Sequence, residues 1–101
     1  MACKVLVSAE ARNDLRAAVL RLSDSLGMPD AARSLLDTFD STLENIEKYP
    51  LMYPLASEPR LARMGYRKVL MGSYLMLYRL EGESALVAHV FHQRREYARL
   101  V

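Results

Sequence analysis

A chain of 101 residues is long enough for one domain with one modest hydrophobic core. Because 51% of the residues are hydrophobic and 26% are charged, the composition is that of a globular protein and excludes intrinsic disorder. No apolar run approaches the ~20 residues that a membrane span needs, and no signal peptide is visible, so we expect a cytoplasmic protein. Cys3 is the sole cysteine, which excludes an internal disulfide and a cysteine-rich metal site.

The charges are distributed unequally along the chain. Residues 1–59 carry 6 basic and 9 acidic groups, a net charge of −3, whereas residues 60–101 carry 8 basic and 3 acidic groups, a net charge of +5. This asymmetry suggests a polyanion or an acidic partner on the basic half. A solvated basic surface without a partner is an equally good explanation, because a charge of this size is not extreme.

The first half of the chain predicts a strand followed by two helices. Residues 3–7 form a short apolar run, typical of a strand at a sheet edge, and Ser8 then suits a helix N-cap. A second helix begins near Pro29 and ends at Pro50, so the two helices form an antiparallel hairpin. Their apolar faces, at helical spacing, are Leu15, Val19, Leu22 and Leu26 in the first helix and Ala32, Leu35, Leu36, Phe39, Leu43 and Ile46 in the second.

The second half predicts three antiparallel strands between residues 66 and 97. Gly72 and Gly82 lie between runs rich in Val, Leu, Tyr, Phe and Met, and glycine reaches the positive φ that hairpin loops need. We expect three-residue loops at 71–73 and 81–83. Residues 93–101 then have room for at most one or two helical turns.

The expected loops set the register of the predicted sheet. They pair Leu70 with Tyr74 and Leu80 with Ser84. Strict alternation then places one set of side chains against the helices: Tyr66, Leu70, Tyr74, Met76, Tyr78, Leu86, Ala88 and Val90. The opposite set is Arg67, Val69, Leu75, Leu77, Arg79, Val87, His89 and Phe91. Because two helices cannot cover both faces, we expect this second apolar face, rimmed by arginines, to bind a partner.

The fold predicted from these elements is one α+β domain over residues 1–101, with an N-terminal helical hairpin packed on a four-stranded, mostly antiparallel sheet. The loop at residues 49–59 carries three prolines among apolar residues. We expect it to lie against the domain rather than to divide the chain.

The element order and several short motifs resemble the RelE/ParE superfamily of toxins from bacterial type II toxin–antitoxin systems. The motifs, which follow one another over nearly the whole chain, are Ala9-Glu10 with Asp14-Leu15, Tyr49-Pro50, Tyr66-Arg67, Tyr74-x-x-x-Tyr78-Arg79 and His92-x-Arg94-Arg95. The resemblance implies a growth-inhibiting toxin of the plasmid-stabilisation type, without cofactor or metal. It also implies an antitoxin partner whose flexible segment folds on binding.

The resemblance leaves three functions open. RelE-like toxins cut messenger RNA on the ribosome, ParE-like toxins inhibit DNA gyrase without being hydrolases, and an inert scaffold would only bind its antitoxin. Metal-free RNA cleavage needs a base, an acid and cations around the phosphorane. The resemblance suggests Arg67, Arg79, His92, Arg94 and Tyr97 for these roles, with Lys68 and Arg95 as further candidates.

One position favours the ParE-like alternative. Leu75 stands where RelE-like nucleases carry an arginine, so a phosphate-stabilising charge is missing. Convergence of Arg67, Arg79 and Arg94 in one pocket would favour the nuclease, whereas arginines that lie apart would favour a binding role. The residues expected to contact the antitoxin are Val69, Leu75, Leu77, Val87, Phe91 and Arg95.

Overall fold

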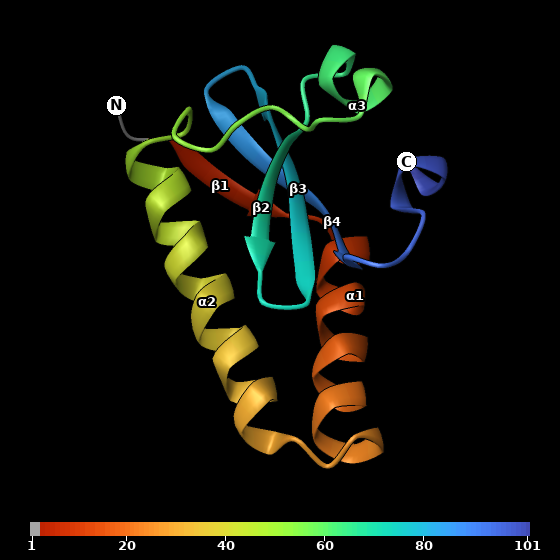
Figure 1. The fold of residues 1–101 in the computed structure, drawn as a ribbon. Coiled ribbons are helices and arrows are strands. Elements are labelled where there is room, and N and C mark those ends of the chain that lie inside the picture. Colours follow the sequence, from red (N-terminus) through yellow and green to blue (C-terminus); the bar gives the residue numbers. More distant parts are fainter. Residues whose placement is uncertain (1–2) are drawn as a thin grey trace.

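The computed structural model describes residues 3–101, in which two long helices cover one face of a four-stranded sheet (Figure 1). The elements follow in the order β1 (Lys4–Val7), α1 (Ala9–Leu20), a π-helical turn (Arg21–Ser25), α2 (Pro29–Lys48), α3 (Pro59–Arg63), β2 (Arg67–Met71), β3 (Tyr74–Glu81), β4 (Ser84–His92) and a 3-10 turn (Tyr97–Leu100). No helix in this part of the chain is both long and apolar enough to cross a membrane. The architecture is the predicted α+β arrangement.

The helical hairpin forms where the sequence supplies its caps. The Ser8 hydroxyl accepts a hydrogen bond from the Ala11 amide at 2.9 Å, which satisfies a backbone donor in the first turn of α1. Gly27 adopts a φ of +62° between the two helices, and Pro29 occupies the first turn of α2. The predicted hairpin is therefore confirmed, although Leu26 and Leu36, assigned to its apolar faces, are 50% and 40% exposed.

The strands lie in the order β1-β4-β3-β2. Strand β1 runs parallel to β4 at one edge, and the other neighbouring pairs are antiparallel. The edge position of β1 and the mostly antiparallel sheet agree with the sequence-based expectation. The loop after α2 borders the other edge, because Lys68 donates its amide to the Pro54 carbonyl at 3.1 Å.

Both hairpin loops are shorter than expected. Met71 pairs with Tyr74 and Glu81 with Ser84, so each loop has two residues and the predicted three-residue loops are wrong. Gly72 has a φ of +61°, and within residues 3–101 no non-glycine residue has a positive φ. A positive φ at the first loop position alone is the arrangement of a type II′ turn, whose twist matches that of the flanking strands.

The shorter loop reverses the predicted faces of β2. Leu70 was expected in the helix-covered core opposite Tyr74, but it pairs with Leu75 and is 63% exposed. Val69 instead packs on the helix-covered side, and Tyr66 belongs to the opposite side. A shift of one residue exchanges the two faces of a strand, which explains all three corrections.

A β-bulge reverses part of β4 as well. Leu77 pairs with His89 but Tyr78 pairs with Val87, which leaves Ala88 as an extra residue. The bulge interrupts strict alternation, so Val87 faces the helices and Ala88 faces away, contrary to the predicted assignment of both.

The chain itself covers the second face of the sheet. Leu75, Leu77 and Phe91 are at most 7% exposed and pack with residues from the 49–59 loop, α3 and the C-terminal turn. These covering residues are Ala56, Leu61 and Tyr97, and Tyr66, directly before β2, packs with them. The expectation of a free apolar face is therefore wrong. Short segments that show no periodic pattern in the sequence cover this face, so no further helices are needed to bury it. Val69 and Val87, also expected to contact a partner, lie in the helix-covered core.

Candidate functional site

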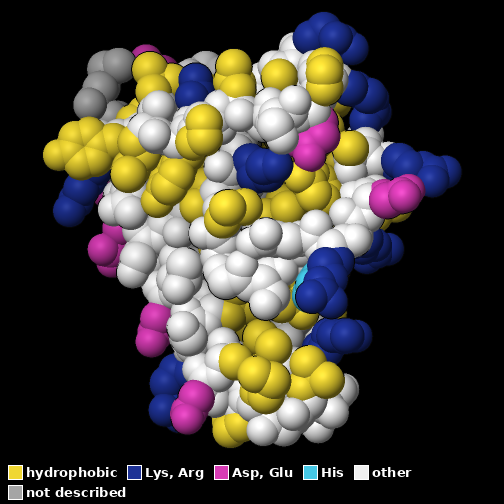
Figure 2. Space-filling model, in the orientation of Figure 1, with side chains coloured by type: hydrophobic (Ala, Val, Ile, Leu, Met, Phe, Trp, Pro, Cys, Tyr) yellow, Lys and Arg dark blue, Asp and Glu magenta, His cyan; other side chains and the backbone are white. Residues whose placement is uncertain are grey.

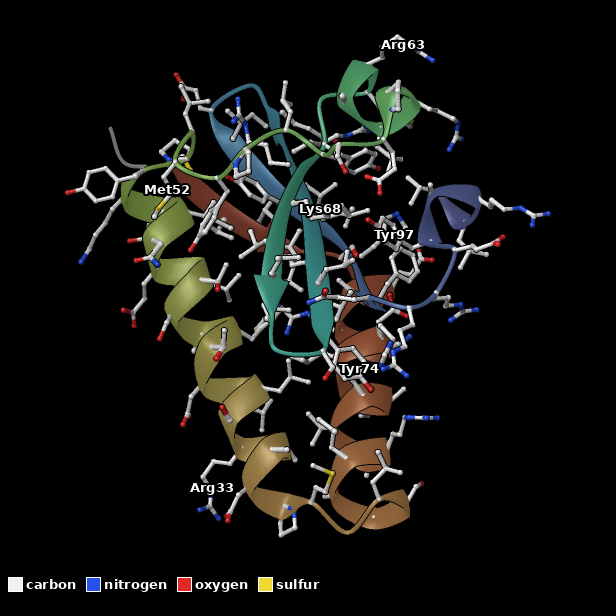
Figure 3. All side chains as sticks on the ribbon, in the orientation of Figure 1. Arg33, Met52, Arg63, Lys68, Tyr74 and Tyr97 are labelled. Atoms are coloured by element: carbon white, nitrogen blue, oxygen red, sulfur yellow. The ribbon has the colours of Figure 1, made fainter. Side chains whose placement is uncertain are left out.

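A groove of about 540 Å³ opens between α1 and the C-terminal end of β4. Its polar or charged lining residues are Asp14, Arg21, Tyr74, His92, Arg94 and Arg95, and its apolar lining residues are Ala17, Ala18, Val90 and Phe91. Figure 3 shows Tyr74 at the end of the β2–β3 hairpin, facing α1, and Figure 2 shows basic side chains beside an exposed part of a histidine on this side. We call this feature the basic groove.

The basic groove carries an excess of positive charge. Arg21, Arg94 and Arg95 are exposed, and none of them forms an ion pair within residues 3–101. Asp14 is the one acidic residue of the lining, and its Oδ2 accepts a hydrogen bond from the Val90 amide at 3.3 Å. Three guanidinium groups therefore share the groove with one carboxylate, which favours an anionic ligand.

The turn that carries two of these arginines is fixed to the sheet. Gln93 donates its side-chain amide to the Gly72 carbonyl at 2.6 Å and its backbone amide to the Ser73 carbonyl at 2.9 Å. His92 accepts the Arg94 amide on Nδ1 at 3.1 Å, and its ring packs edge-on against Tyr74 at 5.1 Å. The β2–β3 loop and the end of β4 thus hold the backbone of the arginine-bearing turn in place.

A second polar cluster lies on the opposite face of the sheet, where Lys68 and Tyr97 point toward one another (Figure 3). Lys68 Nζ donates to the Tyr97 hydroxyl at 2.9 Å, and that hydroxyl donates to Glu58 Oε2 at 2.5 Å. The ammonium also lies 3.6 Å from the same carboxylate oxygen. The cluster fastens the C-terminal turn to β2 and to the start of α3. Arg60 reinforces this attachment by donating to the carbonyls of Ala98, at 2.9 Å, and Val101.

The pKa values in this cluster favour charged Glu58 and Lys68 beside a neutral Tyr97. Burial alone would raise the pKa of Glu58, but the hydrogen bond from Tyr97, a backbone amide and the charge of Lys68 together lower it. Burial opposes protonation of Lys68, yet its bonds to Tyr97 and Glu58 raise its pKa. Burial and the bond to Glu58 raise the pKa of Tyr97, so this hydroxyl is a poor general base at neutral pH.

The structure does not bring the predicted arginines together. Arg67 donates to the Tyr53 carbonyl at 2.7 Å and holds the loop after α2. Arg79 pairs with Glu81 at 2.9 Å, and its guanidinium lies 5.2 Å from the ring centroid of Tyr66. Neither lines the basic groove, where Phe91, His92, Arg94 and Arg95 are the predicted site residues present.

His89 and His92 are three positions apart on β4 and lie on different sides of the sheet. His89 stacks on Phe91 at 5.3 Å on the second face, whereas His92 borders the basic groove. Within residues 3–101 there is no group of three or more His, Cys, Asp or Glu side chains that could hold a metal ion.

The sequence model described as "ParE toxin of type II toxin-antitoxin system, parDE" matches residues 5–97. The chain belongs to the ParE toxin family. The similar solved structures include a chromosomal ParDE toxin–antitoxin system from P. aeruginosa, with a TM-score of 0.70 at 13% identity over 89% of this chain and 95% of that one. They also include the RelBE2 toxin–antitoxin complex from Mycobacterium tuberculosis, with a TM-score of 0.61 at 24% identity over 92% of this chain and 100% of that one.

A further relative of this ParE-family chain is a YoeB/ParE toxin from Agrobacterium tumefaciens, with a TM-score of 0.60 at 12% identity over 89% of this chain and 98% of that one. No curated protein matches the sequence. At these identities the structural likeness establishes the fold, and membership rests on the family match.

Sequence reasoning missed two features of this ParE-family chain. Arg21 comes seven positions after Asp14, at the start of the π-helical turn that follows α1, and both residues line the basic groove. Leu20 and Leu36, 51% and 40% exposed, help to line a second groove, of about 510 Å³, between α1 and α2. We call it the apolar groove; its other lining residues are Val7, Arg12, Leu15, Arg16, Val19, Phe39, Asp40 and Leu43.

Proposed function

We propose that this ParE-family toxin inhibits growth by acting on DNA gyrase, and that it does so by binding rather than by hydrolysis. The observation that supports this most is the separation of Arg67, Arg79 and Arg94, since RNA cleavage requires cations assembled around one phosphorane. Leu75 is 1% exposed and supplies no charge. Tyr97 is held neutral between Glu58 and Lys68, away from the basic groove.

We also propose that an antitoxin neutralises the chain by occupying the apolar groove. Two of the structural relatives are described as toxin–antitoxin complexes, RelBE2 and DinJ-YafQ. The sheet residues first assigned to this contact are buried within the chain, whereas the apolar groove exposes Leu20 and Leu36. An amphipathic helix recognises such a groove through apolar side chains on one of its faces. Arg95, also first assigned to this contact, is exposed at the adjacent basic groove.

The proposed target is tested with purified toxin, gyrase, relaxed plasmid and ATP. We expect the toxin to reduce the formation of supercoiled plasmid. Relaxation by a type I topoisomerase is the matched control, because a basic protein that merely coats DNA would inhibit both enzymes. Equal inhibition of both, or of neither, would contradict a specific action on gyrase.

The alternative is RelE-like cleavage of messenger RNA on the ribosome. It is supported by the proximity of His92, Arg94 and Arg21 in the basic groove, which offers a proton-transfer group beside two cations. A translating extract tests it: new 5′ ends in the message, with gyrase unaffected, would support the nuclease. Neither effect would leave an inert scaffold that binds its antitoxin.

A further inference from the structure

We propose that the basic groove binds the phosphodiester backbone of a nucleic acid, and that this nucleic acid is the DNA held by gyrase. The choice of DNA rests on the proposed function, whereas the phosphate-binding chemistry rests on the groove itself. The toxin would then contact its target complex through DNA as well as through protein.

The arginines are placed for phosphate binding from two sides. Arg21 comes from the π-helical turn after α1, and Arg94 and Arg95 come from the turn after β4, so both walls of the groove carry guanidinium groups. A guanidinium donates two parallel hydrogen bonds to a phosphate, and it keeps its charge at any physiological pH. Short π-helical segments occur frequently at functional sites, which fits the position of Arg21.

The shape of the groove also suits a backbone ligand. Ala17 and Ala18 present small side chains where α1 lines it, which leaves a volume of about 540 Å³. The turn with Arg94 and Arg95 is anchored through Gln93 to the β2–β3 loop, so little backbone motion remains to be lost on binding.

An acidic protein segment fits the basic groove less well. Protein partners contribute affinity through apolar anchors that enter pockets. The bulky aromatic and aliphatic residues of the lining, Tyr74, Val90 and Phe91, are at most 7% exposed and offer no such pocket. The exposed lining is instead positively charged, which is the pattern of a surface that follows a phosphate backbone.

The test is a fluorescence-anisotropy titration of the purified full chain with a short labelled DNA duplex at several salt concentrations. The double variant Arg94→Ala/Arg95→Ala should bind DNA about tenfold or more weakly, and its logarithmic salt slope should fall by about two. The matched control is Arg33→Ala/Arg63→Ala, which removes two exposed charges far from Tyr74, at opposite ends of the molecule (Figure 3). It should remain within about twofold of the wild type.

A gain of affinity provides an independent arm. Asp14→Asn removes the one acidic group of the groove and keeps an oxygen to accept the Val90 amide, so DNA binding should tighten by about twofold to threefold. Circular-dichroism melting checks that each variant is folded. If the double variant fails to fold, two single variants test phosphate binding by the groove instead. Arg21→Ala should weaken DNA binding and Asp14→Asn should strengthen it.

Three results would overturn the proposal. Equal weakening by both double variants would mean that only the net charge of the chain attracts DNA. Tighter binding of a labelled polyglutamate peptide than of DNA would assign the groove to an acidic protein. Tighter binding of RNA of the same sequence would contradict DNA as the ligand. The titration contains no gyrase, so it tests DNA binding separately from the proposed function. If the chain binds DNA through the groove but does not inhibit supercoiling, the action on gyrase is refuted and phosphate binding by the groove is not.

Discussion

Ser8, directly after β1, forms hydrogen bonds with the first turn of α1 and with β4. Its hydroxyl accepts from the Ala11 amide and donates to the Ala88 carbonyl, both at 2.9 Å, and its own amide donates to the Val87 carbonyl at 2.9 Å. The end of β1, the first turn of α1 and the bulge of β4 are thereby fixed to one another. A bulged strand leaves ladder groups unpaired, and Ser8 satisfies one of them.

Replacement of this serine tests its role as a cap. Ser8→Ala should lower the free energy of unfolding by about 1–2 kcal/mol, because it removes an N-cap and leaves the Ala88 carbonyl without its donor. Urea denaturation followed by circular dichroism gives the value. Ser41→Ala, at an exposed position of α2, is the matched control and should stay within about 0.5 kcal/mol of the wild type. Similar effects of the two substitutions would contradict the capping role.

Tyr97 holds the C-terminal turn through its hydroxyl and its ring. Tyr97→Phe keeps the stacking on Phe91, at 5.9 Å, but removes the bonds to Glu58 and Lys68. We expect a loss of about 1–2 kcal/mol in unfolding free energy at neutral pH, since both partners are charged and partly exposed. Chemical denaturation measures it, and an unfolding free energy equal to that of the wild type would mean that the hydroxyl contributes nothing.

The same substitution should change how stability depends on acid. The pKa of Glu58 is below 4.5 in the folded chain, so its contribution is present above pH 4.5 and disappears as the pH falls through the folded value. Tyr97→Phe removes a hydrogen bond that lowers this pKa, which should flatten the decline in unfolding free energy below pH 4.5. Parallel denaturation curves at neutral and acidic pH check this. An unchanged acid dependence would contradict the assigned coupling.

At the scale of elements, the loop between α2 and α3 is held by side chains of β2 and β3. Arg67 donates to the carbonyls of Tyr53, at 2.7 Å, and Leu51, at 3.5 Å, while Tyr78 donates to the Pro50 carbonyl at 2.8 Å. Leu51 and other apolar side chains of this loop are exposed, so they contribute little burial of their own; Figure 2 shows the patch they form. The loop is therefore held mainly by hydrogen bonds.

Arg67→Ala should release this loop without unfolding the sheet. We expect chymotrypsin to cleave after Leu51 or Met52 several-fold faster, because the loop opens locally more often. Limited proteolysis with mass spectrometry measures the rate at these bonds. Arg33→Ala, which removes an exposed arginine from α2, should leave the rate unchanged. Unaltered cleavage of the Arg67 variant would show that the loop does not depend on this contact.

The elements differ in how well the sequence predicts them. The helices α1 and α2 are predictable because each buries one stripe at a period of 3.6 residues, and cap residues mark their ends. The faces of β2 and β4 are not, because a two-residue turn and a bulge at Ala88 each shift the alternation by one residue. The five-residue helix α3 is too short to show any period.

The site is predictable in residue type rather than in geometry. His92, Arg94 and Arg95 are close in sequence, and the structure places them together in the basic groove. Tyr97 and Glu58 are 39 positions apart, and no local pattern connects them. The contacts of Arg67 and Arg79 cannot be predicted from the sequence either. An arginine in a sequence can bind a loop carbonyl, a carboxylate or a ligand, and its residue type does not distinguish these.

At the scale of the whole molecule, α1 separates two surfaces of different chemistry. Val19 and Leu20 line the apolar groove toward α2, whereas Ala17 and Arg21 line the basic groove toward β4. An antitoxin seated in the first groove would lie next to the second. We therefore expect an antitoxin that occupies the apolar groove to block access to the basic groove as well. The antitoxin would then neutralise the toxin by keeping its target away from the positively charged C-terminal half.

The most direct test of the account is pulse labelling of DNA and protein synthesis in bacteria after induction of this chain alone. A toxin that acts on gyrase should reduce incorporation of labelled thymidine first, while labelled methionine continues to enter protein. Collapse of protein synthesis before DNA synthesis would contradict the account and indicate attack on translation. Normal growth with both syntheses unchanged would also contradict it, and would leave only the inert, antitoxin-binding scaffold.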